Sequence, residues 1–124
     1  MHALIVDDED DIREVARMSL ELIGGWTVSV AECGADAIES ARALTPDVIL
    51  LDVMMPDLDG VATLQILSED PTTCHIPVIF LTAKAQVGER RRLEEAGARG
   101  LIGKPFDPMN LAQEVEAILA TAVR

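Results

Sequence analysis

Val48-Ile49-Leu50-Leu51-Asp52 places a carboxylate directly after four consecutive aliphatic residues. Unbroken apolar runs of this length are typical of strands that are buried on both faces of a parallel sheet. Three further runs end on polar residues in the same way: 3–6 before Asp7-Asp8, 78–81 before Thr82, and 100–103 before Lys104-Pro105. We therefore expect four buried parallel strands, each followed by a residue that is able to do chemistry.

Amphipathic segments separate these runs and predict helices. The first is expected over 10–23 and to stop at Gly24-Gly25, with its apolar residues packed inward: Ile12, Val15, Ala16, Met18, Leu22 and Ile23. Further helices are expected over 35–44, from 60 to about 68, and over 86–96. Asp107 and Pro108 predict the start of the last helix, as N-cap and first-turn proline.

Residues 26–30 alternate between apolar and polar side chains, which is typical of a half-exposed strand at the edge of a sheet. The chain then has five strands and five helices in strict alternation. Right-handed connections turn such a chain into an α/β doubly wound three-layer sandwich. With 124 residues, it is expected to form one domain over 1–124.

The polar residues after the strands are predicted to converge, because ligands of such sheets bind at the carboxyl ends of the strands. The carboxylate of Asp52 is able to attack phosphorus and form an aspartyl phosphate. Asp7 and Asp8 would add like charges beside it, and such a cluster is unstable unless a cation joins it. Carboxylate oxygens favour Mg²⁺, which bridges to phosphate. Thr82 and Lys104 would then offer a hydroxyl and an ammonium to the phosphoryl oxygens.

The charge and composition limit the classes of function. A net charge of −12 argues against binding to nucleic acid or to an anionic membrane surface, and favours cations or a basic protein partner. The apolar runs are too short to cross a membrane, and no leader is expected. Cys33 and Cys74 are expected to be free thiols in a reducing compartment, which predicts a cytoplasmic protein.

The spacing of the motifs resembles that of response-regulator receiver domains of two-component signalling. The resemblance rests on four groups of residues: 6–9 (Val-Asp-Asp-Glu), 51–56 with Gly60, 81–83 (Leu-Thr-Ala), and 104–106 (Lys-Pro-Phe). It implies a flavodoxin-like fold with a five-stranded parallel sheet in the order 2-1-3-4-5. One position departs from the family pattern, because Leu101 occupies a place where many members carry an aromatic residue.

The resemblance also implies a role for each site residue. Asp52 would be the phosphoacceptor, supplied by a sensor histidine kinase or a histidine phosphotransfer protein. Asp8, Asp52 and the backbone carbonyl of Met54 would bind Mg²⁺ directly, and Asp7 would act mainly through a metal-bound water. Thr82 and Lys104 would bind the phosphoryl group and report it to a distant surface.

The expected output surface includes the helix with Arg90-Arg91-Arg92 and the last helix, which would contact a downstream target, an output domain or a second copy. Two other classes of function remain open. One is a binding module of the same fold that works without phosphorylation. The other is a Mg²⁺-dependent phosphohydrolase with an aspartate nucleophile, which is disfavoured because such enzymes need a second Asp where this chain has Met54. The expected protein is therefore a regulatory phosphoacceptor, an enzyme only toward itself.

Overall fold

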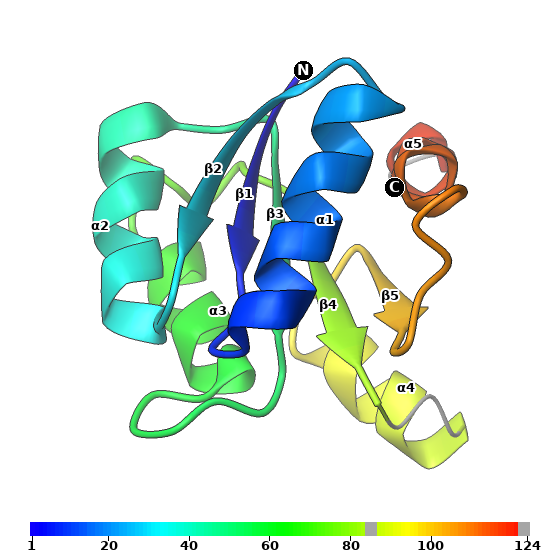
Figure 1. Cartoon of the computed structure of the whole chain (residues 1–124). Helices are drawn as coiled ribbons and strands as arrows, with labels where there is room; N and C mark the ends of the chain where they lie inside the picture. The colour runs from blue at the N-terminus through cyan, green and yellow to red at the C-terminus, as the bar shows by residue number, and fades with distance from the viewer. Residues whose placement is uncertain (84–86, 122–124) are drawn as a thin grey trace.

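In the computed structural model, which describes residues 1–83 and 87–121, five parallel strands form one sheet in the order β2-β1-β3-β4-β5 (Figure 1). Each of the four predicted buried runs lies in a strand, and the predicted edge strand is β2. The strands are β1 (His2–Val6), β2 (Thr27–Ala31), β3 (Val48–Asp52), β4 (Val78–Thr82) and β5 (Gly100–Gly103). The observed order confirms the flavodoxin-like doubly wound fold.

The helices described in residues 1–83 and 87–121 cover both faces of the sheet (Figure 1). They are α1 (Asp10–Leu22), α2 (Gly34–Leu44), α3 (Gly60–Glu69), α4 (Val87–Glu95) and α5 (Leu111–Ala120). The predicted start of the fourth helix, Gln86, lies outside the described residues. In the described part of the chain, no helix has the length and apolar character needed to span a bilayer.

Two apolar clusters hold the three layers together, one on each face of the sheet. Side chains of α1 and α5 pack on one face, for example Leu20 and Val115. Side chains of α2, α3 and α4 pack on the other, for example Leu67 and Leu93. The central strand β3 is buried along its whole length, as its unbroken apolar sequence predicts.

The predicted packing of α1 is wrong for four of its apolar residues. Val15, Met18, Leu22 and Ile23 are exposed by 41–77%, whereas Ala16, Ser19 and Leu20 are buried against the sheet. Ile12 is half-buried. These four exposed residues, together with the buried Ser19 and with Pro108, line an apolar groove of about 240 Å³ between α1 and the loop before α5. We call this the α1 groove.

The predicted start of the last helix is also wrong, since α5 begins at Leu111 with Asn110 as its N-cap. Asp107 instead closes a separate turn. Its Oδ1 accepts a hydrogen bond from the Met109 backbone N–H at 2.9 Å, and the Asn110 amide donates to its Oδ2 at 3.0 Å. The Asp107 carboxylate therefore accepts its hydrogen bonds within this turn and does not cap α5.

Candidate functional site

The register of the sheet brings the predicted site residues to one edge. Val6 pairs with Leu51 in the β1–β3 ladder, so Asp7 follows β1 beside Asp52 at the end of β3. Thr82 pairs with Gly103 in the β4–β5 ladder, and Lys104 follows directly. Because all five strands are parallel, these residues share the carboxyl edge of the sheet.

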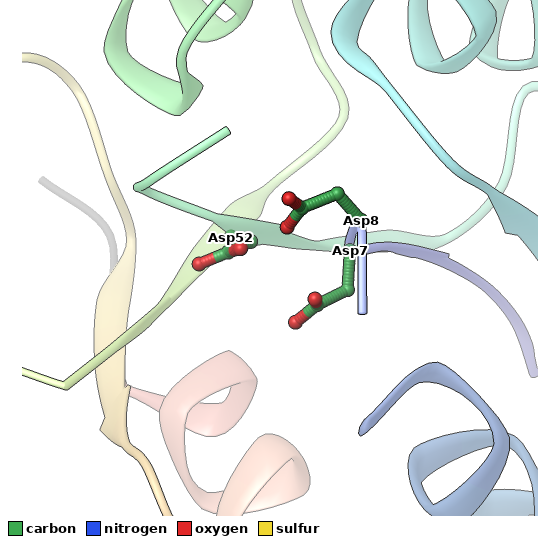
Figure 2. Close-up of side chains that lie close together, drawn as sticks. All are labelled: Asp7, Asp8 and Asp52. Carbon is green, nitrogen blue, oxygen red and sulfur yellow. The ribbon is translucent and has the colours of Figure 1, made fainter. Parts of the chain in front are cut away.

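Three carboxylates form the centre of the site (Figure 2). One carboxylate oxygen from each of Asp7, Asp8 and Asp52 lies within 4.8 Å of the others. Asp7 is fully buried, Asp52 is 4% exposed, and Asp8 is exposed to solvent. The cluster therefore has two buried carboxylates and one at the surface.

Lys104 is the cation that balances this cluster. Its Nζ lies 2.9 Å from Asp7 Oδ2, 3.1 Å from Asp52 Oδ1 and 3.7 Å from Glu9 Oε1. The Lys104 side chain is only 12% exposed. The approach to Asp7 is close but poorly directed, so Asp7 Oδ2 is a buried oxygen without a well-formed hydrogen bond. The peptide bond between Lys104 and Pro105 is cis.

The surroundings of Asp52 raise the pKa of its carboxyl group into the mildly acidic range. Burial, and then the negative charge of Asp7, raise the pKa of Asp52 to about 6, against the lowering effect of Lys104. Burial alone lowers the pKa of Lys104, but its bonds to Asp7 and Asp52 outweigh this, and its pKa is raised overall. Lys104 is therefore a permanent ammonium, while Asp52 changes charge at mildly acidic pH.

The loop after β3 approaches the site through its backbone. The Met54 N–H donates to Asp52 Oδ1 at 3.3 Å, while the Met54 side chain is 73% exposed. Gly60 closes the loop, and its N–H donates to the Val53 carbonyl at 2.9 Å. A Cβ on Gly60 would lie 2.4 Å from the Asp52 carbonyl oxygen, so only glycine fits at this position.

Thr82 lies at the same edge, where the sequence predicts it. The residue is 4% exposed, and its carbonyl accepts a hydrogen bond from the Lys104 backbone N–H at 2.8 Å. The structure thus places Thr82 and Lys104 on adjacent strand ends, with the Lys104 side chain directed to the carboxylates.

The donor set fits a hard divalent cation. Three carboxylates converge, and one of them carries a buried oxygen with no well-formed hydrogen bond. Oxygen ligands of this kind suit Mg²⁺ better than a softer metal. The three carboxylates that could hold a metal ion thus lie together in this fold.

Two residues of the site were missed in the sequence. Glu9 belongs to the 6–9 motif, and the structure adds that its backbone N–H donates a hydrogen bond to Asp7 Oδ1 at 2.8 Å. Arg13 lies on the first turns of α1, and its Nη1 donates to the Asp7 carbonyl oxygen at 2.7 Å. Only the i, i+3 spacing from Asp10 to Arg13 on α1 offers a signal in the sequence. Leu101 is 8% exposed and packs in the core with Phe80 and Leu93.

Comparison with known proteins agrees with this geometry. The model of the response regulator receiver domain family matches residues 3–116. The chain is 37% identical over 117 residues to the response regulator Rre1 of Synechocystis sp., covering 94% of this chain and 51% of that protein. It is 40% identical over 118 residues to the transcriptional regulatory protein CseB of Streptomyces coelicolor, covering 95% and 49%. The chain thus spans about half the length of these curated relatives.

Solved structures give the same result. The chemotaxis protein CheY4 of Vibrio cholerae aligns with a TM-score of 0.88 and 27% identity, covering 94% of this chain and 97% of that chain. Family match, sequence identity and fold are consistent with one another. The chain therefore belongs to the response regulator receiver domains of two-component signalling.

Proposed function

We propose that this receiver domain accepts a phosphoryl group on Asp52 with the help of Mg²⁺. Three observations support this role for Asp52. It lies at the end of the fully buried strand β3, its carboxylate joins the acidic cluster, and its Oδ1 lies 3.1 Å from a lysine ammonium. The second of these carries the proposal, because the charge of three carboxylates this close exceeds that of the one ammonium beside them and favours a divalent cation.

The phosphoryl transfer follows from the chemistry of these groups. A carboxylate oxygen of Asp52 forms a new bond to phosphorus while the bond from phosphorus to an imidazole nitrogen of the donor breaks. The leaving imidazole keeps the electron pair of that bond. The donor is a sensor histidine kinase or a histidine phosphotransfer protein. A small acyl phosphate supplies the same group experimentally.

The residues of the chain divide the remaining work. Asp8, Asp52 and the Met54 carbonyl would hold Mg²⁺ directly, and Asp7 would hold it through water. When bound, the ion supplies positive charge to the phosphoryl oxygens. Lys104 stays protonated, so it is available to pair with a phosphoryl oxygen. Thr82 would donate its hydroxyl to another.

Receiver domains are regulatory, and we propose a regulatory role for this chain as well. It would catalyse only its own phosphorylation and dephosphorylation, as a single domain over 1–124. The exposed Met54 supports this, because a phosphohydrolase of the aspartate-nucleophile class needs an acid at that position. A cytoplasmic location, predicted from the two free cysteines, is part of the same proposal.

The α1 groove is the proposed docking surface for the phosphoryl donor. A protein that brings a phosphohistidine to Asp52 has to cover the surfaces that flank the carboxyl edge of the sheet. Helix α1 begins directly after the acidic pair, and Pro108 follows the loop of Lys104. The groove is apolar, and the nearby Glu14 and Glu21 on α1 pair with Arg17, so the groove suits the apolar face of a helix from the donor.

The output surface is proposed to include α4 and α5. In the described part of the chain, Arg90 and Arg91 are exposed and form no ion pair, while Arg92 pairs with Glu89 at 2.7 Å. Glu114 and Glu116 are exposed on α5. Unpaired cations on α4 and exposed carboxylates on α5 support contact with a protein of mixed charge, such as an output domain, a downstream target or a second copy.

Intact mass measured after incubation with acetyl phosphate tests the proposal. The native chain is expected to gain one phosphoryl group with Mg²⁺ and none without it. Asp52→Asn is expected to gain none in either case. If the native chain gains no phosphoryl group while a known receiver domain does, the phosphorylation-independent binding module becomes the better account. An adduct that persists in Asp52→Asn would show that another residue is the acceptor.

A further inference from the structure

We propose that Arg13 is a positioning residue that sets the Mg²⁺ affinity of the site by holding the peptide group between Asp7 and Asp8. The inference rests on the proposed function, because it concerns the metal that the acidic pair would bind. It assigns a role to a residue outside the groups that would touch the metal or the phosphoryl group.

The Arg13 side chain packs against the loop between β1 and α1. Its side chain is 13% exposed, although α1 lies at the surface. Nη1 donates to the Asp7 carbonyl oxygen at 2.7 Å, and Nη2 pairs with the Asp10 carboxylate. The planar guanidinium thus joins the end of β1 to the first turn of α1.

The bonded carbonyl belongs to the peptide that joins the two carboxylate residues. Because a peptide group is planar, fixing the Asp7 carbonyl also restricts the rotation that precedes the Cα of Asp8. The other parts of Asp7 are held as well. Its N–H donates to the Ala31 carbonyl at 3.2 Å, and its Oδ1 accepts from the Glu9 N–H at 2.8 Å.

Asp8 depends on this backbone restraint more than its neighbours do. Asp7 and Asp52 each contact Lys104 and accept a hydrogen bond from a backbone N–H. The exposed carboxylate of Asp8 forms no hydrogen bond or ion pair with any residue in the described ranges 1–83 and 87–121. The direction of its side chain therefore follows from its backbone, which the contact with Arg13 holds in place.

The sign of the effect separates positioning from simple electrostatics. A guanidinium near the carboxylates repels a divalent cation, so loss of its charge alone would tighten Mg²⁺ binding. Loss of a restraint on Asp8 would weaken it, as is usual when a group that orients a metal ligand is removed. Arg17 provides the matched control. It carries the same charge on the same helix, and among the residues that the structure describes its ion pairs are those with Glu14 and Glu21.

The test is a Mg²⁺ titration of the native chain, Arg13→Met and Arg17→Met, followed by the amide NMR signals of the β1–α1 and β3–α3 loops. We expect Arg13→Met to bind about tenfold more weakly, and Arg17→Met to stay within about twofold of native. The amide signal of Asp8, which shares the peptide with the Asp7 carbonyl, should move in Arg13→Met before any Mg²⁺ is added. A loss of stability alone would leave folded Arg13→Met with native affinity.

Native or tighter Mg²⁺ binding by folded Arg13→Met overturns the inference and leaves the proposed function intact. A native chain that binds no Mg²⁺ at the acidic cluster overturns the proposed metal site, and the inference with it. If Arg13→Met does not fold, Arg13→Lys decides. It keeps the charge but loses the planar fork, and we expect about threefold weaker binding. Native affinity of that variant overturns the inference.

Discussion

Nζ of Lys104 lies 3.1 Å from Oδ1 of Asp52, and the same ammonium lies 2.9 Å from Asp7. The lysine ammonium therefore lies between the two buried carboxylates of the acidic cluster. Its charge offsets part of the repulsion between the two buried carboxylates. Under the proposed function, a divalent cation bound by these carboxylates would compete with the ammonium, which would then be available to pair with a phosphoryl oxygen.

Replacing Lys104 with methionine should tighten Mg²⁺ binding, because the competing charge is removed while the carboxylates remain. We expect an increase in affinity of about fivefold, corresponding to an interaction of about 1 kcal/mol. The same variant should take up a phosphoryl group from acetyl phosphate more slowly than the native chain. Amide NMR titration and intact mass measure the two effects.

Arg42→Met is the control for that variant, since it removes one positive charge from a surface ion pair with Asp70. It should leave both Mg²⁺ affinity and phosphoryl uptake unchanged. Weaker Mg²⁺ binding by Lys104→Met would mean that the lysine organises the carboxylates rather than competing with the metal.

Asp52→Asn should stabilise the metal-free protein at neutral pH. The pKa of Asp52 is raised to about 6 in the folded chain, so above pH 6 folding buries a charge that costs on the order of 3 kcal/mol. As the pH falls below 6, the folded state takes up the proton before the unfolded state does. The stability advantage of Asp52→Asn over the native chain should therefore shrink between pH 7 and pH 4.

Urea denaturation without Mg²⁺ at pH 7.5, 6 and 4.5 measures this difference. The free energies of unfolding of the two proteins should converge toward the acidic end. A constant difference across this range would show that Asp52 has an ordinary pKa and that the stabilisation has another cause.

Gly60→Ala should destabilise the fold by about 2–3 kcal/mol, because the added methyl group would meet the Asp52 carbonyl oxygen at 2.4 Å. The matched substitution is Gly88→Ala on α4, where a Cβ meets no atom within 4 Å. That variant should gain about 0.5–1 kcal/mol from helix propensity. Thermal and urea unfolding give both values, and equal effects at the two positions would exclude the close approach of Gly60 to β3.

Leu20 and Leu22 test which side of α1 faces the sheet. Leu20 is fully buried and Leu22 is 77% exposed. Leu20→Ala should cost about 3 kcal/mol of unfolding free energy, and Leu22→Ala less than about 0.5 kcal/mol. Similar losses for both variants would support the inward packing of Leu22 that the sequence predicts.

The orientation of α1 shows why part of the fold could not be predicted from the sequence. Its buried stripe contains Ala16 and Ser19 next to Leu20, while the more apolar Val15 and Met18 form a second stripe. Small residues let the helix approach the sheet closely, so the stripe with Ala16 and Ser19 is the buried one. A count of apolar residues instead selects the stripe with Val15 and Met18 as the buried one. The strands were easier, because unbroken aliphatic runs such as 48–51 fit few other structures.

The candidate site was predictable where each proposed residue lies at or directly after the end of a strand: Asp52 and Thr82 end β3 and β4, and Asp7 and Lys104 follow β1 and β5. Parallel strands bring such positions together in any fold of this class. The contact of Arg13 was not predictable in this way, because it is made to the backbone carbonyl of Asp7. It depends on the path of the loop between the end of β1 and the start of α1. The restraint by Gly60 likewise depends on a close approach that no spacing reveals.

The most direct test of the account is to locate the phosphoryl group. The chain is incubated with acetyl phosphate and Mg²⁺ and treated with borohydride, which reduces an aspartyl phosphate to homoserine, and its peptides are then sequenced by mass spectrometry. We predict homoserine at position 52 and at no other aspartate. Homoserine at position 7 or 8, or none in a chain that has gained a phosphoryl group, would contradict Asp52 as the acceptor.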